Sequence, residues 1–382
     1  MRVDPNFILN VLQETTQNDP FTAKLVDIYR VYFLESRKQA LSMGVLRSDY
    51  MVSQSGRRPT LRQVEINTIA SSFGFLSERV CRAHRMLALK FPQLRIQLED
   101  MPQNRFMEAI PSAFARALVL YEYKCNIRTQ LSKEVFDDER QLKAELARQK
   151  SSTLVLFVVQ PDERNIADQR FLEFELLSRY GIRSVRKTLA AIGEENQDRS
   201  DSILRANEEE VAISYFRAGY TPDDYPNESC WLGRELIESS RSIKCPDIAT
   251  HLLGTKKVQQ YLAKDGVVEK YIFDDEAVRR IRATFATQYG LGVHDDDREL
   301  GIAAAKASPE LFVLKPQREG GGNNIYGADV RASLTEMSTD ALSAYILQER
   351  FFPPSMRTTF LRSGAVVESD IESELGIYGV LL

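Results

Sequence analysis

The chain has 382 residues, a formal net charge of −4, and 43% hydrophobic and 27% charged residues. Its length suits two or three domains, and its composition is that of an ordinary soluble globular protein. The slightly acidic balance argues against a nucleic-acid or membrane-surface protein, and no apolar run approaches the roughly 18 residues of a membrane span. The N-terminus lacks a signal-peptide core and the four cysteines form no C-x-x-C pair, so we expect a cytoplasmic protein with reduced thiols.

The first predicted elements cover residues 1–67. Residues 1–42 have the apolar spacing of two helices, and residues 46–52 form a short predicted strand that carries Arg47. Farther on, Glu65 and Asn67 alternate with apolar residues, so in a strand they point to the same face. A carboxylate beside an amide oxygen forms a Mg²⁺ site when a third carboxylate arrives, but a solvent-exposed strand face explains the alternation equally well.

A short polar segment of Ala70, Ser71 and Ser72 follows this strand. Its hydroxyl and N–H groups either hold a substrate carboxylate or cap the helix that is predicted to start near Leu76. Residues 76–150 have mostly helical spacing, and the highly charged stretch from residue 132 to residue 150 is predicted to be a solvated helix.

An α/β pattern begins after residue 150. Residues 153–159 form a continuous apolar run, which is typical of a strand buried on both faces, and a predicted helix covers 166–180. Further strands are predicted at 182–188 and 211–216. This alternation indicates a parallel sheet, so we expect a smaller α/β domain at 151–257 and a discontinuous body made of 1–150 and 258–382.

Polar residues that follow the strands of this predicted sheet are candidates for ligand binding, because ligands lie at the carboxyl ends of parallel strands. After the first strand come Glu163, Arg164, Asn165 and Gln169, and after the third come Arg217, Gly219 and Tyr220. Arginines at such an edge suit bidentate binding of a substrate carboxylate, although arginines are also common on surfaces.

The chain continues with a turn and a helix at 245–261, which carries the adjacent Lys256 and Lys257. Such a pair is either a solvated face or a source of one lysine that reaches a phosphate. Two amphipathic helices are predicted within 274–308. A strand at 311–314, a helix at 328–342, a strand at 345–352 and a final strand pair from residue 365 to the end complete the prediction.

The strongest motif is the stretch from Phe312 to Gly327, FVLKPQREGGGNNIYG. Three consecutive glycines, Gly320, Gly321 and Gly322, allow positive φ angles and a nest of backbone N–H groups that binds an anion. Lys315, Glu319 and two asparagines flank them, and a phosphate chain with Mg²⁺ needs such groups. The stretch has neither the GK[ST] of a P-loop nor the G-x-G-x-x-G of a dinucleotide fold.

This stretch resembles the ATP-binding loop of the eukaryotic glutathione synthetases, which are ATP-grasp ligases, without a break from Lys315 to Tyr326. Further segments resemble the same family in the same order. They are FTAKLVDIY, RSDYM, VEINTIASSFG, ERNIADQR, YFRAGY, KCPDIAT, GTKKVQQ, IRATFA and SELGIYGV. The resemblance implies an ATP-grasp α/β fold with the smaller substrate-binding domain inserted.

The resemblance also implies roles for individual residues. The Mg²⁺ ligands are expected to be Glu65, Asn67 and Glu319. The ATP-binding set is expected to be Glu65, Lys256, Lys315, Gly320, Gly321, Gly322, Asn324, Tyr326, Gln348, Glu349, Arg350, Phe351 and Glu374. The substrate-binding set is expected to be Arg47, Ala70, Ser71, Ser72, Glu163, Arg164, Asn165, Gln169, Arg217, Gly219 and Tyr220. Arg47, Lys315 and Glu319 are the expected catalytic residues.

The implied activity is that of glutathione synthase, an ATP- and Mg²⁺-dependent carbon–nitrogen ligase. It joins γ-glutamylcysteine to glycine through an acyl phosphate and releases glutathione, ADP and phosphate. The family is homodimeric and its partners are these small molecules, with no nucleic acid and no membrane. Dimer contacts of the family lie near the N-terminus, which is shorter here, so we expect a weakened dimer.

The family's chains are longer at both ends than this sequence. Beyond SELGIYG they continue into an Arg-x-Lys strand and a lid loop rich in glycine and alanine. An alternative expectation is therefore a truncated form of the synthetase that retains partial ATP and Mg²⁺ binding but is impaired or inactive in ligation. Loss of one phosphate contact typically costs on the order of 10²–10³ in rate.

Overall fold

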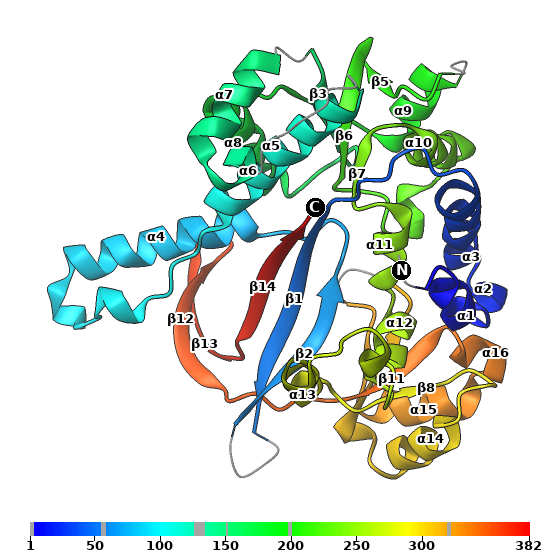
Figure 1. Ribbon diagram of the computed structural model, residues 1–382. Coiled ribbons are helices and arrows are strands. Elements are labelled where there is room, and N and C mark those ends of the chain that lie inside the picture. Colours follow the sequence, from blue (N-terminus) through cyan, green and yellow to red (C-terminus); the bar gives the residue numbers. More distant parts are fainter. Residues whose placement is uncertain (1–3, 55–58, 126–133, 150–151, 198–200, 319–321) are drawn as a thin grey trace. The chain divides into compact units, whose positions relative to one another are not determined.

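The computed structural model describes residues 4–54, 59–125, 134–149, 152–197, 201–318 and 322–382 (Figure 1). Contacts between residues divide the chain into two compact units. The first unit comprises residues 1–30, 47–67 and 249–377, and the second comprises residues 31–46, 68–248 and 378–382. Each unit is therefore assembled from stretches that are far apart in the sequence.

The first unit combines short N-terminal helices with a larger C-terminal part. Its helices are α1 (Phe7–Leu12), α2 (Thr15–Asn18), α3 (Pro20–Ile28), α12 (Lys256–Ala263), α13 (Asp275–Thr284), α14 (Arg298–Ala307), α15 (Ala328–Glu336) and α16 (Thr339–Leu342). Its strands are β2 (Thr60–Asn67), β8 (Gln288–Gly290), β9 (Phe312–Pro316), β10 (Ile325–Tyr326), β11 (Tyr345–Glu349), β12 (Met356–Arg362) and β13 (Ala365–Ile371). Some elements contain a boundary between the units, namely the π-helix Tyr29–Glu35, β1 (Gly44–Ser53), α11 (Ile248–Leu253) and β14 (Glu374–Leu381).

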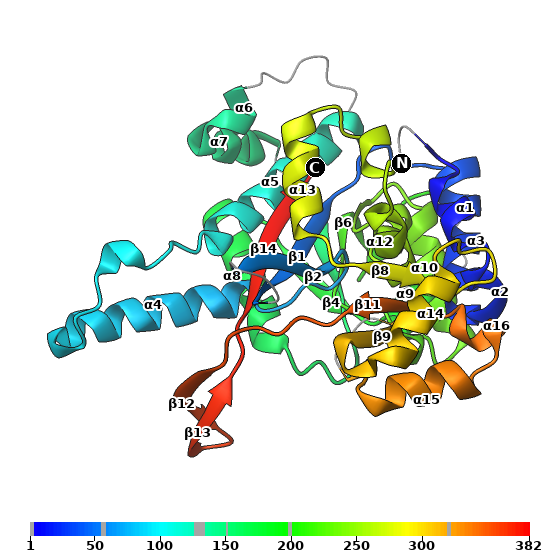
Figure 2. The same ribbon diagram turned by 90° about the horizontal axis from the view of Figure 1, so that it is seen from below.

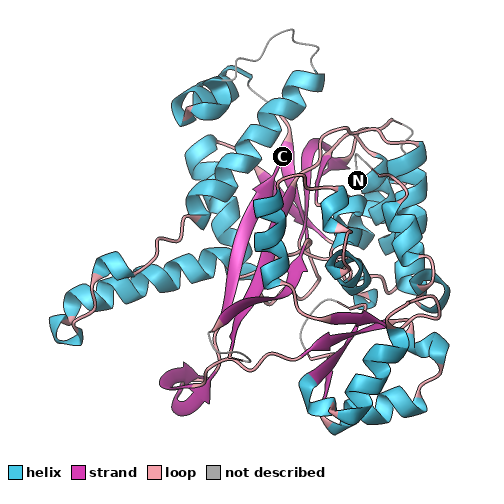
Figure 3. Cartoon of the chain, turned by 60° about the horizontal axis from the view of Figure 1, so that its bottom comes forward, coloured by secondary structure: helices cyan, strands magenta, loops and turns pink. Residues whose placement is uncertain are grey.

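The C-terminal part contains an antiparallel sheet in the order β10–β9–β11–β8, and strands are drawn in magenta in Figure 3. This sheet carries the main hydrophobic contacts of that part. Leu314 of β9 lies opposite Leu347 of β11, and both side chains are fully buried. They share a core with Leu291 and with Val330 and Leu334 of α15. The apolar run that predicted a strand before the glycine-rich stretch therefore corresponds to β9, an inner strand of this sheet.

A second sheet has the order β14–β1–β2. β1 and β2 are antiparallel, with Arg47 opposite Asn67 and Asp49 opposite Glu65, and the register shifts between Asp49 and Tyr50. β12 and β13 form a separate antiparallel hairpin, which projects as a narrow ribbon (Figure 2). This hairpin is largely exposed, and Leu361 has 76% of its surface accessible.

The second unit is an α/β structure. Its helices are α4 (Gly74–Lys90), α5 (Phe106–Cys125), α6 (Glu134–Asp137), α7 (Glu139–Gln149), α8 (Ile166–Tyr180), α9 (Leu189–Asn196) and α10 (Glu228–Ser239). Its strands are β3 (Leu154–Val158), β4 (Ser184–Lys187), β5 (Arg205–Ala206), β6 (Glu209–Phe216) and β7 (Ile243–Cys245). β3 pairs in parallel with β4 and β6, β7 pairs in parallel with β6, and β5 is antiparallel to β6.

The core of the second unit joins this sheet to the long helices. Every residue of β3 is buried, and the ring of Tyr215 on β6 packs edge-on against Phe114 of α5 and Phe157 of β3. Leu142 and Leu146 of α7 also belong to this core. The prediction of a wholly solvated helix at 132–150 is therefore wrong for α7, whose apolar positions are too sparse to stand out among its charges.

The predicted α/β fold class is confirmed, including the helix over residues 166–180 and the parallel sheet. Two details are wrong. The N-terminal part forms several short helices rather than two, and the last strands do not pair with each other, because β13 pairs with β12 while β14 joins β1. The predicted domain boundaries at 150 and 257 stay a prediction. Among the described helices, none combines the length and apolar character needed to cross a membrane.

Candidate functional site

Two lysines and a glutamate of the predicted ATP-binding set lie together in the first unit. The Lys256 ammonium, at the start of α12, is 3.0 Å from the Glu65 carboxylate on β2, and Lys315 of β9 donates to the Val64 carbonyl at 2.9 Å. Lys256 and Lys315 are buried, with 5% and 3% of their surfaces exposed. The alternative of a solvated lysine pair is therefore wrong, and Lys257 is also buried and paired with Asp295.

The electrostatics of Glu65 follow from these neighbours. Burial raises the pKa of Glu65, but the charges of Lys256 and Lys315 and hydrogen bonds from Lys256 and Asn67 outweigh it, so that the pKa lies below its ordinary value. Glu65 is therefore an ionised carboxylate at neutral pH. Such a group is a suitable ligand for a hard cation.

The strand pair β1–β2 adds a carboxylate that sequence reasoning missed, Asp49. Arg47 donates to both oxygens of Asp49, from Nε at 2.7 Å and from a terminal nitrogen at 2.8 Å, and the Asn67 amide donates to Asp49 at 2.7 Å. Asp49 is 3% exposed and lies opposite Glu65 in the register. Its position two residues after Arg47 on one strand was the available signal, because such residues share a face.

Glu374 on β14 belongs to the same electrostatic environment. Burial raises its pKa first, the negative charges of Asp49 and Glu65 raise it further, and the charges of Arg47 and Lys315 only partly oppose this shift. The predicted ATP contact at Glu374 thus lies within the charge cluster. Within the described ranges no three His, Cys, Asp or Glu residues form a group that could hold a metal, while the predicted ligand Glu319 lies outside them.

The glycine-rich stretch is described at its two ends. Glu319, Gly320 and Gly321 lie outside the described residues, and Gly322 has a φ of +94°, which glycine adopts without strain. Before the glycines, Arg318 donates to both oxygens of Asp19 at 2.8 and 3.0 Å. Asp19 is almost fully buried, so this bidentate pair anchors the beginning of the stretch to the N-terminus of α3.

After the glycines, Asn324 donates to the Tyr326 hydroxyl at 3.2 Å, and the Arg350 guanidinium lies over the Tyr326 ring. In the predicted adenine-contacting segment, Gln348 and Phe351 are buried. The N–H groups of Glu349 and Arg350 donate to the carbonyls of Thr287 and Leu311. The N–H groups of Glu349 and Arg350 are therefore already used within the fold.

The predicted substrate residues of the second unit converge on Arg217, just after β6. Its guanidinium donates to the Ser71 carbonyl at 2.6 Å and to the Ser72 hydroxyl at 2.7 Å. Arg217 is 4% exposed, and its Nε is buried without a hydrogen-bond partner in the described part of the chain. The Asn165 side-chain nitrogen is likewise buried and unpartnered there. Unsatisfied buried donors suit a ligand that brings acceptor oxygens.

The remaining predicted substrate residues are largely engaged with one another. Glu163 accepts from the Asn165 N–H at 2.8 Å and from the Gln169 amide at 2.6 Å, and Gln169 also accepts from Arg186. Arg164 is exposed. The side chains of Glu163 and Gln169 are therefore already hydrogen-bonded within the fold and hold this part of the second unit in place.

The backbone N–H groups of Gly219 and Tyr220 both donate to the Asp224 carboxylate at 3.0 Å. Gly219 has a φ of +92°, and a Cβ there would lie 2.9 Å from the Tyr225 hydroxyl, so this turn requires glycine. Ala70, with a φ of +51°, marks a second tight turn, ahead of Ser71.

Asp168 is a further residue that sequence reasoning missed. Its carboxylate, on α8, accepts from the backbone N–H groups of Phe73, Phe75 and Leu76 at 2.9, 3.0 and 3.1 Å. It thus caps α4 from another element, and the N-cap residue is Phe73 rather than a serine. The alternative in which Ser71 or Ser72 caps the helix is therefore wrong. Asp168 fixes the turn that carries both serines.

Comparison with known proteins gives consistent findings. A family model described as the ATP-binding domain of eukaryotic glutathione synthase matches residues 1–382. The chain is 37% identical over 384 residues to the chloroplastic glutathione synthetase of Arabidopsis thaliana, covering 100% of this chain and 65% of that protein. It is 38% identical over 378 residues to the glutathione synthetase of Homo sapiens, covering 98% of this chain and 73% of that protein.

A solved structure supports the fold alone. The glutathione synthetase-like effector of Globodera pallida in its apo form has a TM-score of 0.69 and 20% sequence identity, and the match covers 98% of this chain and 76% of that one. The chain spans less than two thirds of the Arabidopsis relative's length.

Proposed function

The chain belongs to the eukaryotic glutathione synthase family, and on this premise we propose that it catalyses ATP-dependent ligation of γ-glutamylcysteine to glycine. The family implies a nucleotide substrate. The observation that carries the proposal is the convergence of buried Lys256 and Lys315 on the ionised carboxylate of Glu65. Buried cations beside a carboxylate are expected where a phosphate chain and a divalent cation bind together.

We propose Mg²⁺ as the divalent cation. The donor set fits it, because Glu65 and Asn67 present hard oxygen atoms from one face of β2, and the pKa of Glu65 keeps its carboxylate ionised. Glu319 would supply the third ligand. When bound, Mg²⁺ would polarise the phosphoryl oxygens and reduce the charge that develops on them.

Residues of this chain would then position the reacting groups. Lys256 and Lys315 would bind oxygens of the phosphate chain. The cysteinyl carboxylate oxygen forms a bond to the γ-phosphorus while the bond between the γ-phosphorus and the bridging β-phosphate oxygen breaks. This step releases ADP and gives an acyl phosphate. The glycine nitrogen attacks the acyl carbon and loses a proton, and phosphate leaves with its electron pair.

For the dipeptide we propose Arg217 as the carboxylate-binding group in the second unit. Support comes from its burial, its orphan Nε and the hydrogen bonds that join it to the Ser71–Ser72 turn. A buried guanidinium with one donor unused is suited to an incoming carboxylate oxygen. Arg47, which Asp49 holds within the first unit, stays a predicted substrate-binding residue.

The test is ADP release by the 382-residue chain with ATP, Mg²⁺, γ-glutamylcysteine and glycine, with glutathione identified by mass. We expect glycine-dependent ADP release together with product. ADP release without product would mean that acyl phosphate forms and is lost to water. A folded chain that binds nucleotide but releases no ADP would favour the alternative of a form impaired in ligation.

The metal assignment is tested by Glu319→Gln. We expect this substitution to abolish Mg²⁺-dependent strengthening of ATP binding, measured by calorimetry with and without Mg²⁺, because a neutral amide replaces a charged ligand. Glu336→Gln, at an exposed position of α15, is the matched control and should bind like the parent chain. Equal Mg²⁺ dependence in both variants would refute the role of Glu319.

Further expectations about the acceptor, the assembly and the location stay predictions. They are glycine as the acceptor amino acid, a weakened homodimer, and a cytoplasmic location, the last because the curated relatives include proteins named as chloroplastic. Sedimentation showing a tight dimer at micromolar concentration would contradict the second.

A further inference from the structure

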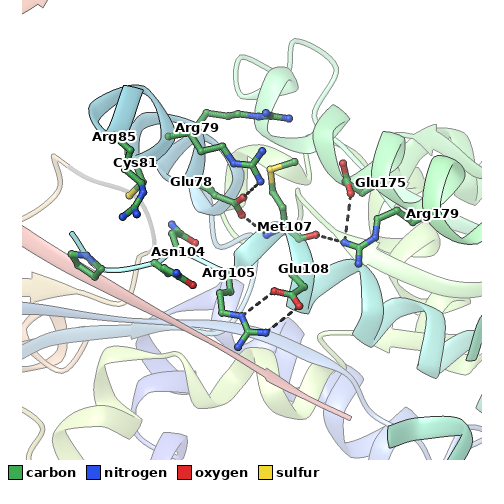
Figure 4. A pocket seen from close by; sticks show the side chains of 13 residues that line it. Glu78, Arg79, Cys81, Arg85, Asn104, Arg105, Met107, Glu108, Glu175 and Arg179 are labelled. Carbon is green, nitrogen blue, oxygen red and sulfur yellow. Dashed lines mark hydrogen bonds and ion pairs between the residues drawn. The ribbon is translucent and has the colours of Figure 1, made fainter. Parts of the chain in front are cut away.

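A cavity rich in arginine lies beside α4 in the second unit, apart from the residues proposed for catalysis (Figure 4). Its volume is about 370 Å³, which falls in the size range of small-molecule sites. Its walls come from α4, from the segment leading into α5 and from α8. Five arginines and three glutamates contribute to its lining: Arg79, Arg82, Arg85, Arg105, Arg179, Glu78, Glu108 and Glu175.

The charges of the lining do not cancel. Each lining glutamate is paired with one lining arginine, at 2.7 Å for Glu78–Arg82, 2.9 Å for Glu108–Arg105 and 3.6 Å for Glu175–Arg179. Arg179 also pairs at 3.0 Å with Glu139, which does not line the cavity. Arg79 and Arg85 have no carboxylate partner among the described residues. The cavity therefore has two cations in excess.

The two unpaired guanidiniums are nevertheless held in place. Arg85 donates from one terminal nitrogen to the carbonyls of Leu98 and Met101 at 3.0 and 3.1 Å, which leaves its other N–H groups for a ligand. Arg79 lies over the Phe171 ring, 4.9 Å from its centre. Because planar guanidiniums held in this way bind carboxylate and phosphate oxygens well, the cavity is suited to a doubly charged anion.

We propose that this cavity is a binding site for a small dianion that carries carboxylate or phosphate groups, and that its occupant acts as an effector rather than a substrate. The three lining carboxylates disfavour a larger polyanion such as a nucleoside triphosphate, because its extra charge would lie against them. Two unpaired arginines match two negative charges.

The geometry also connects the cavity to the proposed substrate turn, and this part rests on the proposed function. Glu78 lies in the second turn of α4 and accepts from the Met107 N–H at 2.7 Å. Asp168 holds the first residues of the same helix, and the Ser71–Ser72 turn directly precedes it. A ligand that fixes α4 at Arg79 and Arg85 would therefore alter how firmly this turn presents itself to the dipeptide.

Binding is tested directly by thermal unfolding at constant ionic strength, with chloride replaced by inorganic phosphate in one arm and by succinate in the other. We expect at least one of the two anions to raise the Tm of the parent chain by more than it raises the Tm of the double variant Arg79→Gln/Arg85→Gln. A response to phosphate alone identifies a phosphate ligand, and a response to succinate alone identifies a dicarboxylate. Equal Tm responses in the parent and double variant, with both anions, would overturn the proposal.

The controls separate this site from others. Arg140→Gln, at an exposed position of α7, removes one positive charge, as Arg79→Gln does, and should respond like the parent chain. Arg79→Gln alone keeps the Arg85 bonds that fold the 98–101 turn, and we expect it to weaken binding about tenfold or more, as for loss of a charged hydrogen bond. A Tm response that survives in Arg79→Gln and in Arg79→Gln/Arg85→Gln, but is lost in Arg217→Gln or Lys315→Ala, would assign the anion to the proposed active site. This result would refute the proposed site beside α4.

The effector role has its own readout. In the parent chain we expect the bound anion to change KM for γ-glutamylcysteine at least twofold while KM for ATP is unchanged, and this change should vanish in Arg79→Gln/Arg85→Gln. An unchanged KM with intact binding would reject the effector role. If the chain does not ligate at all, the thermal-unfolding result still decides whether the site exists, so the two failures are distinguishable.

Discussion

Single carboxylates organise each of the two proposed ligand sets, and Asp168 is the clearest case. It is 5% exposed and accepts hydrogen bonds from three backbone N–H groups of another segment. A carboxylate near a helix N-terminus is favoured by the helix dipole and by the otherwise unpaired N–H groups there. Because it touches no proposed substrate group directly, its role is to position the Ser71–Ser72 turn.

The prediction for Asp168→Asn is a selective loss of dipeptide binding. An amide offers one acceptor oxygen instead of two and carries no charge, so the turn should loosen. We expect KM for γ-glutamylcysteine to rise on the order of tenfold with KM for ATP unchanged, and stability to fall by about 1–2 kcal/mol. Asp162→Asn, an exposed neighbour, serves as the control in the same kinetic assay. A parallel rise of both KM values would indicate general damage rather than positioning.

Glu65 makes a pH prediction. Burial raises the pKa of Glu65, but the lysine charges and the hydrogen bonds lower it by more than burial raises it. The net shift of the pKa is therefore downward. The folded state therefore binds this proton less tightly than the unfolded chain does. At pH values above the ordinary glutamate pKa of about 4.3, Glu65 stabilises the fold. This contribution is lost as the pH falls through the lower pKa of the folded state.

The corresponding measurement is denaturant unfolding of the parent chain and Glu65→Gln between neutral pH and pH about 3. We expect the parent chain to be more stable at neutral pH, because the variant leaves Lys256 and Lys315 without their carboxylate. The difference should shrink as the pH falls below about 4. A difference that is constant with pH would show that the pKa of Glu65 is not lowered.

At the scale of elements, the sequence predicted those whose own pattern is strong. β3 is a continuous apolar run, and α8 combines helical spacing with a glycine after its end, so both were found with little error in their limits. β12 was missed because most of its residues are exposed and no buried apolar side marks it. The glycine-rich stretch was recognised from local chemistry, since its residues are adjacent in the chain.

What was missed in the site depends on distant parts of the chain. Asp168 reaches a segment more than ninety positions away, and Asp19 reaches Arg318 across most of the sequence. No local periodicity records such a contact, because hydrogen bonds between side chains and remote backbone depend on the assembled fold. The burial of the adjacent lysines, Lys256 and Lys257, has the same origin.

The element β11 provides a stability prediction. Leu347 is fully buried between β9 and β8, so Leu347→Ala should lower the free energy of unfolding by about 2–5 kcal/mol through lost burial and the cavity left behind. Leu361→Ala, on the exposed hairpin, is the matched control and should change it by less than about 0.5 kcal/mol. Equal losses in chemical denaturation would mean that β12 is covered in solution.

At the scale of the whole molecule, the two proposed ligand sets fall in different compact units. The lysines and the strands flanking the glycine-rich stretch belong to the first unit, while Arg217 and the serine turn belong to the second. Each ligand should therefore protect a different part of the chain from opening.

Hydrogen exchange tests this division. We expect Mg²⁺ and ATP to slow amide exchange in residues 312–316 and 345–349, and γ-glutamylcysteine alone to slow it in residues 70–76 and 165–169. Arg217→Gln should abolish the second pattern and leave the first intact. Protection of only the second unit by ATP would contradict the assignment of the nucleotide site.

The interleaving of the units has a consequence for synthesis. Residues 68–248 are continuous and contain the whole parallel sheet, whereas the first unit needs residues 1–30 and 47–67 to meet residues 249–377. On a ribosome, which delivers the chain from its N-terminus, the parallel sheet can form early. The early strand pair carrying Glu65 must wait for Lys256 and Lys315 to emerge. Until then the Glu65 carboxylate lacks both lysines, so the N-terminal part of a nascent chain would need protection by chaperones for the longest time.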